Sequence, residues 1–170
     1  MSRYEYDKST DSTTDHGSEA EVFAEYLRQR GLKFTSARRK LLDRIFDMHD
    51  HFTADQLLDR LRSENMRVSK ATVYRTLTVM LDSRLLVSHD FGEGALYYEH
   101  THGHAPHEHI FCLGCKTIVE FRSPATAAQL TEIAADLGFR LIFHSLKAFG
   151  LCDECSSKPD VVNRFKGRGV

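Results

Sequence analysis

The sequence predicts an α+β protein with two domains, a helical N-terminal domain and a smaller C-terminal domain built on strands. Apolar side chains recur at helical spacing in four segments between residues 20 and 82, whereas three segments after residue 108 are rich in apolar, β-branched and aromatic residues. All four cysteines lie in that later part. We expect a disordered N-terminal tail, two domains and a C-terminal tail, at 1–18, 19–98, 99–157 and 158–170.

Three of the helical segments begin after a residue suited to cap a helix. Thr35, Thr53 and Ser69 each precede a run with apolar residues at intervals of three and four. The segment after the last run, "RLLVSHDFGEGALYYE", alternates around a glycine-rich turn and predicts a β-hairpin. Within it, His89 is either a surface residue or a phosphate contact, and the sequence does not decide between them.

The last helical segment, "SKATVYRTLTVMLDSRLL", predicts a helix that reads DNA. Val73, Leu77 and Met80 recur on one face, which indicates burial. The opposite face carries side chains that suit phosphates, base edges and thymine methyl groups, namely Lys70, Ala71, Tyr74, Arg75 and Thr78. A short helix, a turn, such a second helix and a hairpin together form a winged helix-turn-helix arrangement.

Local charge supports this interpretation, although the formal net charge of the whole chain is only −1. Between residues 26 and 75 there are twelve basic and six acidic residues, an excess that favours binding to a phosphate backbone. The alternative is a helical bundle with ordinary surface charges.

The C-terminal part predicts a small α+β domain. "HIFCLGC", "KTIVEFRS" and "RLIFHSLKAFGLC" are expected to be strands, and a helix between the last two is expected to begin near Pro124 and end at Gly138. A domain of about sixty residues buries little apolar surface, so a metal and a partner subunit would both stabilise it. Helix-turn-helix proteins usually read two half-sites as symmetric dimers, which predicts a homodimer.

The cysteines form two Cys-x-x-Cys pairs, Cys112 with Cys115 and Cys152 with Cys155. The chain start is polar and lacks the apolar stretch of a secretory signal, and no apolar run approaches the ~18 residues that span a bilayer. We therefore expect a cytoplasmic protein with reduced thiols and no membrane contact. Two such pairs predict one tetrahedral Zn²⁺ site, and the alternative is four unrelated structural or redox thiols.

Histidines and glutamates predict a second, thiolate-free metal site. His107 and His109 alternate along an extended segment, so they share one face, where Glu99 and Glu120 could join them. Glu108 points to the opposite face.

His144 and a loop histidine such as His104 could join Glu108 there, although His144 in an apolar strand is also compatible with a hydrogen-bonded core histidine. Imidazole with carboxylate suits Fe²⁺, Mn²⁺, Co²⁺ or Zn²⁺.

An ordered series of motifs covers most of the chain: "GLKFTSARRKLL", "HFTADQLLDRL", "SKATVYRTL", "HEHIFCLGCKTIVEF", "GFRLIFHSL" and the final "CDEC". Through these motifs the chain, from about Glu21 to Cys155, resembles the ferric uptake regulator family of metal-dependent transcriptional repressors. The resemblance implies a winged-helix domain, a hinge, and a dimerisation domain whose four cysteines bind one structural Zn²⁺ per chain.

The resemblance also implies roles for individual residues. A regulatory metal site at the domain junction would comprise His51, Glu99, His107, His109 and Glu120. DNA contacts would come from Lys33, Tyr74 and Arg75, to which we add Arg38, Lys70 and Thr72. The metal would bridge the domains and fix their angle, so that without it the two recognition helices of a homodimer lose their spacing.

The chain departs from the family at an additional metal site. Pro106 stands where the family commonly has a histidine, and Ala127 where that site has a glutamate. Glu108 and His144 are kept, and His104 is the candidate substitute.

The expected function is Fe²⁺-dependent repression through binding to double-stranded DNA, at AT-rich inverted-repeat operators of metal-homeostasis genes. Mn²⁺ or Zn²⁺ are candidate substitutes for Fe²⁺. The chain has glutamate at positions 99 and 120, where peroxide-sensing relatives usually carry aspartate. Alternatives within the family are a zinc-uptake or a peroxide-responsive regulator. A zinc hydrolase is the alternative from another class, but no His-Glu-x-x-His pattern accompanies the ligands, and we do not expect an enzyme.

Overall fold

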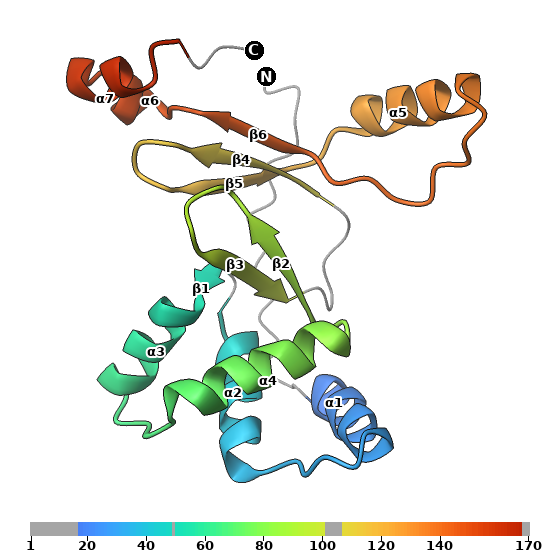
Figure 1. Cartoon of the computed structure of the whole chain (residues 1–170), viewed down its shortest axis with the longest axis vertical. Coiled ribbons are helices and arrows are strands. Elements are labelled where there is room, and N and C mark those ends of the chain that lie inside the picture. The colour runs from blue at the N-terminus through green and yellow to red at the C-terminus, as the bar shows by residue number, and fades with distance from the viewer. Residues whose placement is uncertain (1–16, 49, 101–106, 168–170) are drawn as a thin grey trace. The chain divides into compact units, whose positions relative to one another are not determined.

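The computed structural model describes residues 17–48, 50–100 and 107–167. The chain divides into two compact units, Thr10–Ala105 and Pro106–Val170. This division lies later than the predicted boundary after residue 98, because Glu99 and His100 complete strand β3 (Leu96–His100) of the first unit. Figure 1 shows the elements of both units along the chain.

The first unit contains four helices among its described residues (Figure 1), namely α1 (Gly17–Gln29), α2 (Ser36–Phe46), α3 (Ala54–Ser63) and α4 (Lys70–Asp82). The three predicted caps are confirmed. The hydroxyls of Thr35, Thr53 and Ser69 each accept a hydrogen bond from the backbone N–H three residues ahead. At α3 the cap is a capping box, because the Gln56 side chain also accepts from the Thr53 N–H.

One apolar core holds this unit together. It takes side chains from all four helices and from the strands, with Phe23, Leu41, Leu57, Leu77 and Leu86 among the members that are almost fully buried. Burying a Leu or Phe side chain contributes about 1.5–3 kcal/mol, so the helix positions are set mainly by this core rather than by local preference.

A three-stranded antiparallel sheet completes the first unit, in the order β1-β3-β2. The hairpin of β2 (Leu86–Asp90) with β3 confirms the expected wing. The short strand β1 (Phe52–Thr53) was not predicted. It pairs Phe52 with Tyr98, and continuing that register places the preceding residue, His51, opposite Glu99.

The second unit has a sheet in the order β5-β4-β6. Its elements are β4 (Glu108–Cys112), β5 (Ile118–Phe121), α5 (Pro124–Asp136), β6 (Lys147–Gly150), α6 (Asp153–Ser156) and α7 (Pro159–Arg164). β4 pairs antiparallel with β5 and parallel with β6.

Two sequence expectations for this unit were wrong in part. The last predicted strand covered residues 140–152, but β6 occupies only Lys147–Gly150, because its pairing begins at His109↔Lys147 and β4 itself starts only one residue earlier. The predicted C-terminal tail also contains helix α7, which begins at Pro159, a residue well suited to a first helical turn.

The apolar side chains of the second unit are poorly covered within the chain. Helix α5 buries none of its residues, and Leu137 and Phe143 are 69% and 82% exposed. Among the described residues of this unit, the buried apolar side chains are only those of Phe111, Cys112 and Cys155. Within the part of the chain that the structure describes, no helix is both long and apolar enough to cross a membrane.

Candidate metal centres and DNA-binding helix

Helix α4 presents the predicted DNA-reading face to solvent. Val73, Leu77 and Met80 are buried as expected, and Thr76 joins them, with its hydroxyl donating to the Thr72 carbonyl at 2.8 Å. Tyr74 is 41% exposed, so its ring lies outside the core.

Arg75 is also exposed, as are Ala71 and Thr78. The buried and exposed faces of α4 therefore separate as the sequence pattern indicated.

The other predicted DNA contacts have partners within the first unit. The Arg38 guanidinium donates to the Lys33 carbonyl at 2.7 Å and so holds the loop that carries the exposed Lys33. The Lys70 ammonium donates to the Asp55 carboxylate at 3.1 Å, which raises the pKa of Lys70, and lies 5.6 Å from the centre of the Tyr74 ring. Both partners of the Lys70–Asp55 pair are solvent-exposed, so a phosphate could displace Asp55 at little cost.

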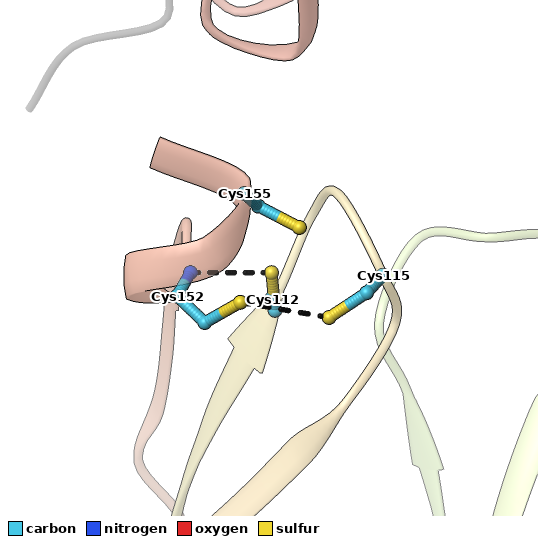
Figure 2. A group of neighbouring side chains, drawn as sticks. All are labelled: Cys112, Cys115, Cys152 and Cys155. Atoms are coloured by element: carbon cyan, nitrogen blue, oxygen red, sulfur yellow. Dashed lines mark hydrogen bonds between the residues drawn. The ribbon is translucent and has the colours of Figure 1, made fainter. Parts of the chain in front are cut away.

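The structure brings the four cysteines together (Figure 2). Cys112 ends strand β4 and Cys115 lies in the following turn, while Cys152 precedes α6 and Cys155 lies within it. Parallel pairing of Cys112 with Gly150 places the start of α6 beside the β4 end. The Cys152 N–H then donates to Cys112 Sγ at 3.3 Å, and the Leu113 N–H donates to the Gly150 carbonyl at 2.8 Å.

The distances fit a tetrahedral zinc site. The four Sγ atoms lie within 4.8 Å of one another, and those of Cys115 and Cys152 are 3.7 Å apart. Zn–S bonds of about 2.3 Å in a tetrahedron place sulfurs about 3.8 Å apart. Because the two pairs converge in this way, the alternative of four unrelated thiols is wrong.

The surroundings shift the pKa values of two of the thiols in opposite directions, and only the deprotonated thiolate binds metal. Burial raises the pKa of Cys112, but backbone N–H donors from Cys115, Cys152 and Gly114 outweigh this and lower it to about 6. Burial and then the neighbouring thiols raise the pKa of Cys155 to about 12. Metal binding to the Cys155 sulfur therefore releases a proton, and zinc affinity is expected to rise with pH.

Gly114 allows α6 to approach the turn between the first two cysteines. A Cβ atom at this position would lie 2.6 Å from Cys155 Sγ and 2.8 Å from Cys155 Cβ. We expect Gly114→Ala to displace Cys155 and to weaken zinc binding about tenfold, as outer-shell changes at metal sites do. Competition with a chelator measures this, and Gly150→Ala is the control, because a Cβ there meets nothing within 4 Å. Equal zinc affinity in the two variants would contradict the steric role.

The first unit carries one pair of candidate regulatory ligands. His51 Nε2 lies 2.7 Å from Glu99 Oε2, and both side chains are largely buried. The chain positions them through the β1–β3 pairing, which no local pattern announces. Only the pairing of Phe52, the residue after His51, with Tyr98 would have placed His51 beside Glu99, and that pairing spans 46 residues of sequence.

The second unit carries the other candidate ligands. His109 lies opposite Glu120 in the β4–β5 register, and His107 Nε2 lies 3.7 Å from Glu120 Oε2. The rings of His107 and His109 are 4.8 Å apart. His107, His109 and Glu120 therefore lie on one face of the sheet, as strand alternation predicted.

The opposite face of β4 holds the remaining pair. Glu108 is buried, and its Oε1 lies 3.1 Å from His144 Nε2. This contact is the hydrogen-bonded arrangement considered for His144. His104 lies outside the described residues.

His89 is a functional candidate whose role the sequence left open. It is buried rather than exposed, and its Nε2 hydrogen-bonds to Glu99 Oε1 at 3.1 Å. A surface position and a phosphate contact are therefore both wrong.

A winged-helix unit followed by a small unit with a four-cysteine cluster and exposed apolar faces defines the class of metal-dependent DNA-binding regulators. Comparisons with known proteins agree. The model of the ferric uptake regulator family matches residues 29–149. The ferric uptake regulation protein of Neisseria meningitidis is 35% identical over 134 residues, which cover 78% of this chain and 92% of that protein.

Solved structures show the same fold. The ferric uptake regulator of Vibrio cholerae is 31% identical with a TM-score of 0.66, covering 76% of this chain and 98% of that one. The ferric uptake regulator of Francisella tularensis with iron is 28% identical with a TM-score of 0.69, covering 74% and 96%. The chain belongs to the ferric uptake regulator family. Its members are transcriptional regulators and not enzymes, so the hydrolase alternative is wrong.

Proposed function

We propose that the protein is an Fe²⁺-dependent repressor that binds operator DNA as a homodimer in the cytoplasm. The observation that carries this proposal is the distribution of ligands along the chain. A buried histidine–carboxylate pair ends the wing of the DNA-binding unit, and a second such set begins the sheet of the other unit. Only a short stretch of sequence, between His100 and Glu108, connects β3 to β4.

We infer that His51 and Glu99 from the first unit and His107, His109 and Glu120 from the second bind one ion together. The first set offers two donors and the second offers three, whereas the five nitrogen and oxygen donors together suit a five- or six-coordinate divalent ion. When bound, the ion supplies a link between two units that are otherwise joined by a short peptide. Its presence would fix the angle between the wing and the dimerisation unit.

Iron is the favoured ion for two reasons. The donors are imidazoles and carboxylates with no thiolate, a set that suits Fe²⁺ along with Mn²⁺, Co²⁺ and Zn²⁺, and the Francisella relative was solved with iron. Mn²⁺ and Zn²⁺ share this donor preference in part. The cysteine cluster, by contrast, fits permanent Zn²⁺.

The DNA contacts would come from the exposed face of α4 and from the loop before α2. Tyr74 and Arg75 would reach base edges and phosphates, and Lys33 would lie close to the backbone. Homodimer formation is supported by the second unit, where α5 and the segment after it expose apolar side chains that a second copy would cover, namely Ile133, Leu137, Phe139, Ile142 and Phe143.

The proposal is tested by titrating the zinc-loaded protein with Fe²⁺, Mn²⁺ or Zn²⁺ under anaerobic conditions and following binding to a fluorescent duplex. The duplex is an AT-rich inverted repeat from a promoter of the host, with a scrambled duplex as control. We expect Fe²⁺ or Mn²⁺ to promote binding to the repeat alone, and Arg75→Ala to weaken it about tenfold at every metal concentration, because a charge-assisted base or phosphate contact is lost.

Three results would redirect this proposal. Promotion by Zn²⁺ alone, at concentrations where Fe²⁺ has no effect, would indicate a zinc-uptake regulator. Irreversible loss of DNA binding after peroxide treatment of the Fe²⁺ form would indicate a peroxide-responsive one. Equal binding to the scrambled duplex would contradict operator recognition.

A further inference from the structure

We propose that His89 is a positioning residue for the regulatory ion, because it retains one oxygen of Glu99 so that this carboxylate offers a single oxygen to the metal. The inference rests on the proposed function, in which Glu99 is a ligand. It assigns a role to a residue that contributes no donor atom itself.

Strand register brings the two side chains together. β2 and β3 pair His89 with Tyr97 and Val87 with Glu99. His89 and Glu99 are therefore diagonal neighbours on the same face of the hairpin, a separation that long side chains can bridge. The His89 Nε2 to Glu99 Oε1 distance of 3.1 Å is that of a hydrogen bond.

Two histidines thus divide the Glu99 carboxylate between them. His51 Nε2 lies 2.7 Å from Oε2, while His89 contacts Oε1. The His51 and His89 rings are 5.6 Å apart. If His51 and Oε2 both turn to an ion, the Oε1 hydrogen bond can persist unchanged.

Packing prevents the His89 ring from turning away. Its side chain is 11% exposed, and the ring stacks on Phe91 at 5.9 Å with an interplanar angle of 30°. Phe91 in turn packs edge-on against Tyr97 at 5.4 Å. A ring fixed in this way can hold the carboxylate in one orientation before metal arrives, and such preorganisation raises affinity.

The same contacts connect the metal site to the wing. Glu99, His89, Phe91 and Tyr97 form one continuous set of neighbours in the β2–β3 hairpin. If Glu99 binds the ion through one oxygen, its other oxygen keeps the hydrogen bond to His89, and the hairpin is held to the ion in one orientation. A chelating carboxylate, by contrast, would take a second coordination position and release His89.

The test compares two substitutions in the full-length, zinc-loaded protein. His89→Phe keeps an aromatic ring against Phe91 but removes the nitrogen, whereas His89→Gln keeps an N–H donor. Ser88→Ala is the control in the same hairpin, because Ser88 is the exposed neighbour of His89 on β2, and it should keep the wild-type Mn²⁺ affinity. Mn²⁺ affinity is measured by competition with a chelator, and the coordination of Co²⁺ is followed by its visible absorption.

We expect His89→Phe to raise the Mn²⁺ dissociation constant about 10- to 100-fold, the usual effect of losing an outer-shell partner, and His89→Gln to restore most of the affinity. The Co²⁺ spectrum of His89→Phe should change in intensity as Glu99 takes a second position, while that of His89→Gln should match the wild type. Thermal stability of the zinc-loaded, Mn²⁺-free protein reports separately on packing.

Two results would overturn the inference alone. Wild-type Mn²⁺ affinity and Co²⁺ spectrum in His89→Phe would show that Glu99 needs no partner. An equal loss in His89→Phe and His89→Gln would show that ring packing, not the hydrogen bond, matters. If the wild-type protein binds no ion besides the one at the cysteines, the proposed function itself fails, and this inference fails with it.

Discussion

Replacement of Cys112 by serine is expected to abolish zinc binding and to unfold the second unit. Cys112 ends the central strand and accepts the Cys152 N–H, so its loss removes a ligand and the contact that holds α6 to the sheet. Few residues of this unit are buried, so its stability depends heavily on the metal. Zinc sites contribute folding free energy directly, about 10–16 kcal/mol in isolated zinc-finger peptides.

The measurements are zinc content per chain and thermal unfolding. We expect zinc to fall from one per chain to none, and a loss of even about 4 kcal/mol would lower the melting temperature by about 8–16 °C in a chain of this size. Ser156→Ala, on the same helix but outside the ligand set, is the control and should behave as the wild type. One zinc per chain in the serine variant with an unchanged melting temperature would show that Cys112 is not a ligand.

Replacement of both His107 and His109 by alanine is expected to abolish metal-dependent DNA binding without unfolding the protein. The two imidazoles lie on the same face of the β4–β5 pair as Glu120 of β5, so their removal leaves the second unit a single regulatory donor. We expect the affinity for Fe²⁺ or Mn²⁺ to fall at least about 100-fold, since two inner ligands are worth more than the 10- to 100-fold of an outer-shell partner.

The appropriate control is His144→Ala, which removes a histidine of the same unit that contacts Glu108 on the opposite face. It should keep metal-dependent DNA binding, and both proteins should keep one zinc per chain. An unfolded, zinc-free double variant would make the His107–His109 site structural. Loss of metal response in His144→Ala instead would move the regulatory site to the other face of β4.

Local features of this protein were predictable because they depend on neighbouring residues. The caps Thr35, Thr53 and Ser69 bond to the N–H three positions ahead, so a single segment contains the whole interaction. The common face of His107 and His109 follows from strand alternation alone. Each Cys-x-x-Cys spacing is local as well, and two such pairs predicted one thiol cluster, although Cys115 and Cys152 lie 37 residues apart in the sequence.

Features that depend on long-range register were not predictable from composition or spacing. Strand β1 is only two residues long, yet its pairing with β3 is what brings His51 to Glu99. The resemblance to the family supplied His51, while periodicity gave no signal for it. His89 was undecided because its partner lies ten residues away across the hairpin.

The limits of β6 show a related difficulty. Residues 140–146 contain four apolar or aromatic side chains that would suit a strand, but a strand also needs a partner, and the pairing with β4 begins only at Lys147. The exposed apolar side chains of this segment and of α5 are instead consistent with the proposed contact to a second copy. A single sequence does not distinguish burial within a chain from burial between two chains.

In the proposed mechanism, an ion bound by both units controls DNA binding. The most direct test is the operator affinity of the zinc-loaded protein, measured anaerobically before and after addition of Fe²⁺. Allosteric coupling between two sites is typically about 5- to 150-fold, and we expect an increase within that range that a chelator reverses. An affinity that is the same with and without Fe²⁺, in a protein shown to have bound the ion, would contradict the claim.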